Sequence, residues 1–219
     1  MTRPGLVLLH TSPVHVPVFD ALRDRHHPGA VLRHLVEPEL LERARDAEGP
    51  RAVAPALLAV LASATPAAGP APVLVTCSTI GATAESLAPE LGVPVLRVDR
   101  PMAAAAVRTG ARIAVLAALE STLAPTAELL AEEAEAGGRR VSVRTHLVAG
   151  AWERFEAGDT DGYLARVAAA ADAVTGADVI VLAQASMAGA AGLTASPVPV
   201  LSSPAPGLAA GLRLASASR

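Results

Sequence analysis

The sequence contains no lysine, because all 18 of its basic residues are arginine. This absence excludes a lysine Schiff base, and with it pyridoxal-phosphate chemistry of the usual kind, and also a phosphate-binding loop that ends in Gly-Lys-Ser/Thr. Cys77 is the only cysteine, so neither an internal disulfide nor a zinc site built from several cysteines can form. The six histidines include no His-x-x-x-His pair, and we expect no metal site.

Aromatic residues make up only 2% of the 219 residues, although hydrophobic residues make up 52%. The core must therefore consist mostly of Ala, Val and Leu, and so apolar a chain is expected to fold. The formal net charge is −3 and no basic block occurs, which argues against a nucleic-acid partner. No apolar run reaches the roughly 18 residues of a membrane helix, and the first apolar run is too short for a signal peptide. We expect a cytoplasmic protein without a membrane partner.

Short apolar runs of strand length alternate with longer segments rich in Ala, Leu, Glu and Arg. The expected strands are 6–9, 31–36, 72–76, 93–98, 112–119, 141–148, 178–182 and 198–201. The expected helices are 16–25, 37–47, 51–64, 82–90, 102–109, 124–135, 160–174 and 188–193. The strands are hydrophobic almost throughout, as strands covered on both faces are. This alternation predicts an α/β fold with parallel sheets and right-handed crossovers.

The second half of the sequence repeats the first half in the same order. Three pairs of similar segments are separated by about half the chain, namely 31–36 with 143–148, 72–79 with 179–186, and 93–96 with 198–201. Such a repeat indicates two homologous lobes, each with a mainly parallel four-stranded sheet. We assign residues 1–105 to an N-terminal lobe and 106–203 to a C-terminal lobe. We expect residues 204–219 to form a C-terminal helix and tail that packs back on the N-terminal lobe.

Four loops follow the expected strands at the edge where ligands bind in open α/β sheets. They are residues 10–13, 77–81, 120–122 and 184–187. If the two lobes face each other, these loops line a shared cleft, which we expect to be the active site. The loops are rich in Ser and Thr and precede expected helices, whose first backbone N–H groups suit a carboxylate.

Cys77 and Gln184, the only glutamine, occupy equivalent positions of the repeat. Both directly follow a buried expected strand, at a turn into a helix. The positive end of a helix favours a thiolate, which could take a proton from a carbon acid or attack as a nucleophile. The structural alternative is an inert cysteine that fills a small space in the core.

The segment Thr76-Cys77-Ser78-Thr79, followed by an expected helix, resembles the first cysteine motif of the aspartate/glutamate racemase superfamily. That superfamily includes hydantoin racemases, maleate isomerases and arylmalonate decarboxylases. The segment 182–187 resembles the second motif, with Gln184 where the racemases carry a cysteine. The resemblance covers essentially the whole chain. It implies two pseudo-symmetric Rossmann-like lobes with the site between them, no cofactor, no metal, and a homo-oligomer, in the family usually a dimer.

The resemblance also implies roles for individual residues. Cys77 would be the acid–base or nucleophilic thiol. Residues of all four loops would contact a small carboxylate substrate, and His10 joins them because it ends the first expected strand. The expected substrate contacts are His10, Thr11, Ser12, Ser78, Thr79, Ser121, Thr122, Gln184, Ala185 and Ser186.

Gln184 departs from the family pattern, because an amide is neither an acid nor a base near neutral pH. Two-base racemisation needs one thiol on each face of the α-carbon. Three reactions therefore remain open. One base at Cys77 could protonate the carbanion left by decarboxylation, Cys77 could add to an unsaturated diacid and allow cis–trans rotation, or His146 could serve as the second base.

The leading hypothesis is a cofactor-independent, racemase-like isomerase that moves a proton at the carbon α to a carboxylate. A one-cysteine decarboxylase (a lyase) or a cis–trans diacid isomerase is the runner-up. A relative that binds a carboxylate and catalyses nothing is the alternative from another class.

Overall fold

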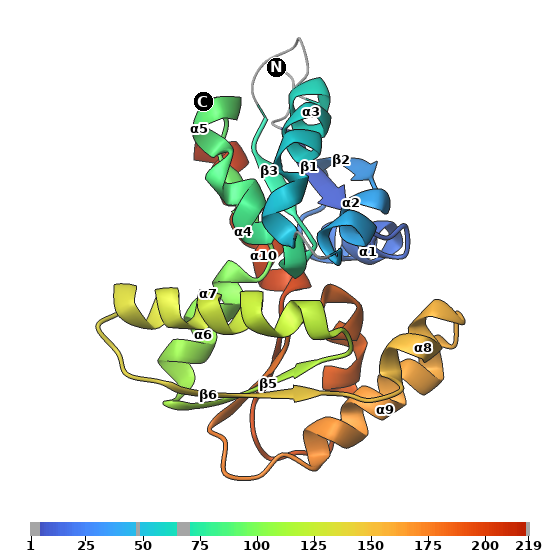
Figure 1. Cartoon of the computed structure of the whole chain (residues 1–219), viewed down its shortest axis with the longest axis vertical. Helices are drawn as coiled ribbons and strands as arrows, with labels where there is room; N and C mark the ends of the chain where they lie inside the picture. Colours follow the sequence, from blue (N-terminus) through green and yellow to red (C-terminus); the bar gives the residue numbers. More distant parts are fainter. Residues whose placement is uncertain (1–4, 47–48, 65–70, 218–219) are drawn as a thin grey trace. The chain divides into compact units, whose positions relative to one another are not determined.

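The computed structural model describes residues 5–46, 49–64 and 71–217. The chain divides into two compact units. Unit 1 holds the residues up to Val98 together with those from Pro204 on, and unit 2 holds Asp99–Ser203. Each unit has its own four-stranded parallel sheet with helices around it (Figure 1). The predicted α/β fold with two parallel four-stranded sheets is confirmed.

The sheet of unit 1 has the strand order β2-β1-β3-β4, and all its neighbours are parallel. Its strands are β1 (Gly5–His10), β2 (Val31–Val36), β3 (Val73–Val75) and β4 (Val95–Arg97). Its helices are α1 (His15–His26), α2 (Glu39–Ala44), the 3-10 helix η1 (Pro50–Val53), α3 (Ala54–Ala64), α4 (Ser78–Ser86), α5 (Ala88–Leu91) and α10 (Pro204–Ala217).

Side chains of β1 alternate between the two faces of this sheet, as the pleat requires. Leu6 and Leu8 pack with Phe19 of α1 and Leu208 of α10. Val7 and Leu9 belong to a second apolar cluster, which lies on the face covered by α2, α3 and α4. The central strand is therefore buried on both sides.

Unit 2 repeats this plan with the strand order β6-β5-β7-β8. Its strands are β5 (Arg112–Ala117), β6 (Ser142–Leu147), β7 (Val179–Leu182) and β8 (Val200–Ser202). Its helices are α6 (Arg100–Thr109), the 3-10 helix η2 (Glu120–Thr122), α7 (Leu123–Ala136), α8 (Ala151–Glu156), α9 (Thr160–Asp172) and the 3-10 helix η3 (Ala185–Gly192). One face of the sheet packs against α6 and α7, and the other packs against α8 and α9 (Figure 1).

The sequence repeat corresponds to a structural repeat. The three repeated segments fall on β2 and β6, on β3 and β7, and on β4 and β8. Cys77 is the N-cap of α4 and Gln184 is the N-cap of η3, and both have an extended backbone, with φ −107° and ψ 115° against φ −116° and ψ 140°. The two residues thus hold the same place in their units.

Several details of the sequence-based prediction are wrong. The strands predicted at 31–36 and 141–148 were expected to be covered on both faces, but β2 and β6 are sheet edges, and β6 is exposed at every residue except half-buried Val143. The sequence does carry a signal for β6, because four of its six residues are polar, whereas the central strand β5 has one polar residue among six. The helix predicted at 188–193 is instead the 3-10 helix η3, the short helix α8 was not predicted, and residue 47 of the helix predicted at 37–47 lies outside the described residues.

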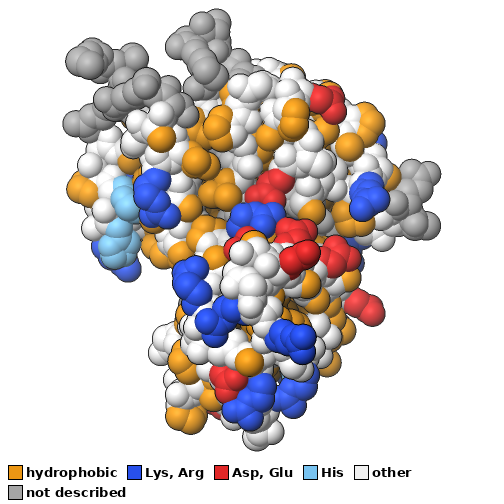
Figure 2. Space-filling view, turned by 90° about the vertical axis from the view of Figure 1, so that its left-hand side faces the viewer, with side chains coloured by type: hydrophobic (Ala, Val, Ile, Leu, Met, Phe, Trp, Pro, Cys, Tyr) orange, Lys and Arg blue, Asp and Glu red, His pale blue; other side chains and the backbone are white. Residues whose placement is uncertain are grey.

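Hydrophobic side chains are spread among polar ones over the face of the molecule shown in Figure 2. The large exposed hydrophobic residues belong to several different elements and loops, namely Val14, Val18, Val31, Leu147 and Leu193. Among the described residues, no helix has both the length and the apolar character that crossing a bilayer requires.

Gly81 lies in the first half of α4, directly against the buried side chain of Arg97. A Cβ atom at Gly81 would lie 2.9 Å from the Cβ of Arg97 and 3.0 Å from its Nε. Because the Cβ of Arg97 is fixed by β4, this side chain cannot simply swing away. The close approach of α4 to β4 therefore depends on glycine.

We expect Gly81→Ala to lower the free energy of unfolding by about 1–3 kcal/mol, the usual cost of forcing an extra carbon into a packed interior. Urea denaturation of the purified protein measures this difference. Gly192→Ala is the matched control, because a Cβ at Gly192 would meet no atom within 4 Å. Equal destabilisation by the two substitutions would contradict the packing argument.

Candidate active site

In unit 1, the parallel pairing of β1 with β3 brings two predicted loops together. His10 ends β1, and its Nδ1 lies 2.8 Å from Oγ1 of Thr76, which follows β3. Thr11 and Ser12 continue from the first strand, and the residues from Cys77 to Thr79 continue from the second. We call these residues the Cys77 group, and its members are His10, Thr11, Ser12, Thr76, Cys77, Ser78 and Thr79.

Cys77 stands at the start of α4 and makes no side-chain capping hydrogen bond there. The first N–H groups of a helix have no partner within the helix and form its positive end. The thiol is free but buried, with 8% of the residue exposed, and it packs in the apolar cluster that contains Val75 and Ile80. Burial of this degree fits both an inert packing cysteine and a thiol in a water-poor reactive site.

Arg97 is an almost fully buried cation beneath α4. Its Nη2 donates to the backbone carbonyl of Ser78 at 3.4 Å, and its backbone N–H donates to Glu85 Oε1 at 3.1 Å. The guanidinium thus contacts the first turn of the helix that begins after Cys77. The sequence analysis missed this residue, although a charged residue inside the apolar run 93–98 is a signal that could have identified it.

Both ring nitrogens of His10 are bonded to protein groups, Nδ1 to Thr76 and Nε2 to Nδ1 of His34 at 2.8 Å. Burial, followed by the nearby charges that His15 and His34 can carry, lowers the pKa of His10 to about 3. Burial also lowers the pKa of His15 to about 4, and neither ring nitrogen of His15 has a hydrogen-bond partner among the described residues. Both imidazoles are therefore neutral near pH 7. The role of His10 as a substrate contact stays a prediction.

In unit 2, Gln184 holds the loop that follows β5. Its Oε1 accepts hydrogen bonds from the backbone N–H groups of Ala118, at 2.6 Å, and Leu119, at 3.2 Å. Since β5 and β7 are paired, this bond connects the ends of two neighbouring strands. The side chain is a structural acceptor, and its amide has no acid–base function near neutral pH.

The other predicted residues of unit 2 lie beside Gln184 in sequence or in the loop after β5. Ser121 Oγ is buried without a hydrogen-bond partner in the described part of the chain, and the carbonyl of Thr122 accepts a bond from Thr126. Ser186 Oγ shares a 2.8 Å hydrogen bond with the hydroxyl of Tyr163. Burial raises the pKa of Tyr163 to about 12, so this phenol stays protonated.

His146, the candidate second base, lies on the edge strand β6 and its side chain is exposed. It is paired in register with Leu116 of β5, as His34 is paired with Leu8 of β1. The equivalence of the two histidines in the repeat is therefore structural. Their surroundings differ, because His34 is bonded to His10 and is half-buried.

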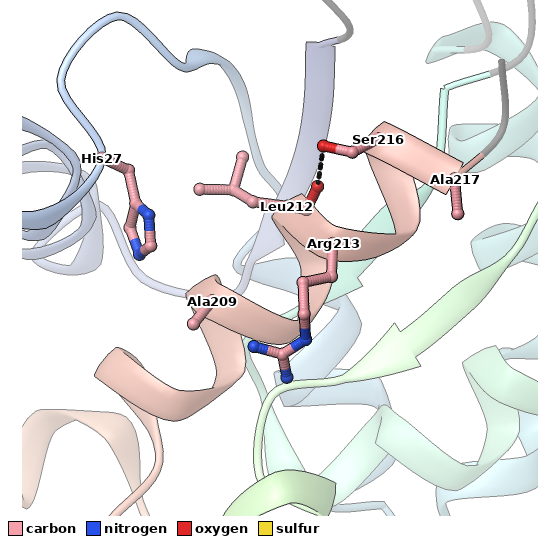
Figure 3. A pocket seen from close by; sticks show the side chains of 6 residues that line it. All are labelled: His27, Ala209, Leu212, Arg213, Ser216 and Ala217. Carbon is pink, nitrogen blue, oxygen red and sulfur yellow. Dashed lines mark hydrogen bonds between the residues drawn. The ribbon is translucent and has the colours of Figure 1, made fainter.

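One hollow of unit 1, with a volume of about 480 Å³, lies beside α10 (Figure 3). Its lining residues are His27, Ala209, Leu212, Arg213, Ser216 and Ala217. The hydroxyl of Ser216 donates to the carbonyl of Leu212 within the helix. None of the Cys77 group lines this hollow. Within 5–46, 49–64 and 71–217, no cluster of three or more His, Cys, Asp or Glu side chains could hold a metal.

The two buried neutral histidines make stability sensitive to acid. In the unfolded chain they take up protons near pH 6.5, but in the folded protein only near pH 4 and below. The unfolded state then binds more protons, so the free energy of unfolding falls as the pH drops from 6.5 towards 4. We expect each histidine to contribute a slope of up to about 1.4 kcal/mol per pH unit. Urea titrations of the wild type and His15→Gln at pH values across this range measure it.

Removing His15 should make the slope clearly smaller, whereas His26→Gln, at an exposed position of α1, should leave it unchanged. A wild-type slope that His15→Gln does not reduce would contradict a neutral buried His15.

Known proteins that resemble this chain identify the family to which it belongs. The family model described as Asp/Glu/Hydantoin racemase matches residues 17–210. No curated protein sequence matches the chain. Among solved structures, glutamate racemase isoform RacE1 from Bacillus anthracis is similar with a TM-score of 0.71 and 16% identity, over 100% of this chain and 84% of that chain. Allantoin racemase from Pseudomonas fluorescens is similar with a TM-score of 0.64 and 19% identity, over 98% and 91%.

A variant of arylmalonate decarboxylase is also similar, with a TM-score of 0.62 and 17% identity, over 99% of this chain and 95% of that chain. At these identities the solved structures show a shared fold. The family model, in contrast, covers most of the sequence. Together with the two parallel sheets and their internal repeat, this match shows that the chain belongs to the Asp/Glu/Hydantoin racemase family.

Proposed function

We propose that this chain is a cofactor-independent isomerase that transfers a proton at the carbon α to a carboxylate, with the Cys77 thiolate as the acid–base group. The observation that carries the proposal is the place of Cys77 in a chain of this family. Cys77 stands at the N-terminus of α4, beside the loop that follows β1, and its side chain makes no capping bond.

The start of α4 would bind the substrate carboxylate. Its first-turn N–H groups and the hydroxyls of Ser78 and Thr79 are hydrogen-bond donors, and the helix end and Arg97 favour negative charge. The Cys77 thiolate would take the proton from the adjacent carbon, and the electron pair of the broken C–H bond would move onto the carboxylate oxygens. Because an α-proton is only weakly acidic, aimed N–H dipoles must stabilise this enolate-like charge.

Gln184 favours a second candidate, a one-cysteine decarboxylase. The bonds of its Oε1 to the backbone fit a structural role, and its amide cannot deliver a proton to the opposite face of the carbon. With one thiol, a substrate C–C bond to a carboxylate would break, carbon dioxide would leave, and Cys77 would donate the proton that replaces it. A cis–trans diacid isomerase would likewise need only this thiol.

The burial of Cys77 favours a third candidate from another class, a carboxylate-binding relative without catalysis. In that case the sulfur would be a packing atom of the apolar cluster of unit 1. The three candidates differ in what the thiol does, and isotope exchange separates them.

In heavy water, we expect the wild type to replace the α-hydrogen of a small carboxylate with deuterium. Cys77→Ala should do so at least about 100-fold more slowly, because a positioned acid–base group usually contributes a factor of this size. Aspartate, glutamate, hydantoins, arylmalonates and maleate are the first substrates, with mass spectrometry and chiral chromatography as readouts. Cys77→Ser is the matched control of size.

Exchange without inversion would indicate one-base proton transfer at Cys77, and loss of carbon dioxide would assign the lyase. Binding of an acid by calorimetry, without exchange or turnover of any of them, would refute catalysis and support the carboxylate-binding relative. Exchange that survives in Cys77→Ala would refute the role of the thiol.

Gln184→Cys tests whether the missing second thiol limits inversion. We expect this variant to invert the α-carbon faster than the wild type, because it restores a thiol at the N-cap position equivalent to that of Cys77. Gln184→Ser is the control, since it also removes the amide but adds no thiol. Equal inversion rates in these two variants would contradict the prediction.

A further inference from the structure

Four side chains of unit 1 form a continuous chain of hydrogen bonds from the surface to the residue before Cys77. Asp20 Oδ1 lies 3.4 Å from His34 Nε2, His34 Nδ1 lies 2.8 Å from His10 Nε2, and His10 Nδ1 lies 2.8 Å from Thr76 Oγ1. Exposure decreases along the chain, from 36% for the Asp20 side chain and 15% for that of His34 to 0% for His10. This hydrogen-bonded chain connects α1, β2 and β1 with the residue that follows β3.

The histidine rings are held in place by their neighbours. The rings of His10 and His34 are stacked, with centroids 5.1 Å apart and an angle of 18° between their planes. Phe19 and His15 pack on His10 with centroid distances of 5.6 and 6.0 Å. With the rings fixed, the order of donors and acceptors can change only through the positions of protons.

The inner end of the chain has two possible directions. The Thr76 hydroxyl can donate to His10 Nδ1, or it can donate to the carbonyl of Leu9 at 3.1 Å and accept from His10. In the first arrangement His10 carries its proton on Nε2 and donates to His34, whose own proton on Nε2 points to Asp20. Both imidazoles are then neutral.

The second arrangement contains one more proton. His34 then carries protons on both nitrogens, donating to the Asp20 carboxylate and to His10 Nε2, and His10 donates from Nδ1 to Thr76. Thr76 turns its hydroxyl proton to Leu9. A single proton taken up at the outer end therefore reverses the two inner bonds, while His10 remains neutral and only changes its tautomer.

Few other charged side chains lie next to this series of hydrogen bonds. From α1, Arg23 contacts Asp20 at 2.8 Å and His15 packs on His10. From the segment after β2, Glu37 donates its backbone N–H to the carbonyl of His10, and the charged residue of α10, Arg213, is exposed. Burial keeps both His10 and His15 neutral down to acidic pH, and the His34–Asp20 pair is the end of the hydrogen-bonded chain that solvent reaches.

We propose that Asp20, His34 and His10 are positioning residues for the Thr76–Cys77 turn, and that one proton at the His34–Asp20 end sets the direction in which Thr76 donates. The relevance of this switch to catalysis rests on the proposed function, but the switch itself does not. It would couple solvent pH to the start of α4 without any movement of the backbone.

Nitrogen-15 NMR of histidine-labelled wild type tests the proton positions directly. Between about pH 8 and pH 5, the range in which histidines take up protons, we expect His10 to change from the tautomer protonated on Nε2 to the one protonated on Nδ1. We expect His34 to become protonated on both nitrogens with the same midpoint. One unchanged tautomer of His10 over this range, or double protonation of His10, would overturn the proposal.

The coupling to Cys77 has its own readout. Because Cys77 is the only cysteine, cysteine labelled with carbon-13 at Cβ gives one NMR signal. We expect this signal to show a step at the midpoint of the His10 change. His34→Gln should abolish the step, and Asp20→Asn should move it to lower pH, because the carboxylate stabilises the added proton. His26→Gln, an exposed histidine of α1, is the matched control and should change neither.

A tautomer change in His10 without a step at Cys77 would overturn the positioning role. A step that persists in His34→Gln would do the same. Neither measurement needs a substrate. The tautomer change of His10 and the step in the Cys77 signal can therefore occur in a protein that exchanges no acid. That outcome would refute the proposed function and leave the positioning role intact. The wild-type measurements also stand if a variant fails to fold.

Discussion

The parallel pairing of the central strand with its neighbour, β1 with β3 in unit 1 and β5 with β7 in unit 2, is the constraint on which both candidate groups depend. Two neighbouring parallel strands end at the same edge of the sheet, and the backbone N–H groups of the residues that follow no longer have partners in a neighbouring strand. Those groups must find new acceptors or remain open to a ligand. The two units meet this requirement differently.

In unit 2 the N-cap residue supplies the acceptor at this edge, because Gln184 Oε1 accepts hydrogen bonds from two backbone N–H groups of the loop after β5. In unit 1 the junction is made one residue earlier, by Thr76 with His10 and Leu9. Neither N-cap side chain caps its own helix, and the thiol of Cys77 also takes no part in the junction of unit 1. The same position in the repeat thus carries a structural side chain in one unit and an uncommitted sulfur in the other.

Much of this arrangement could be predicted from the sequence, because it follows from periodicity and order. Alternating apolar and helical segments predicted the parallel sheets, and the repeat predicted that Cys77 and Gln184 are equivalent. The link between His10 and His34 could not be predicted, since it depends on the register that pairs Leu8 with His34 across β1 and β2. The exposure of β6, in contrast, could have been predicted, because four of its six residues are polar whereas β5 and β7 are almost wholly apolar.

The number of thiols decides whether the site needs a supply of protons. A two-base racemase gives one proton to the substrate for each proton it removes, so the enzyme's proton count is unchanged after every turnover. A decarboxylase consumes one proton from the thiol in every turnover, and a buried thiol must regain it from solvent. Cys77 is buried, and the hydrogen-bonded chain from Asp20 through His34 and His10 ends at Thr76, the residue before it. Because this hydrogen-bonded chain ends one residue before the sulfur, its proposed part is to orient the Thr76–Cys77 turn, and the lyase candidate continues to rest on Gln184.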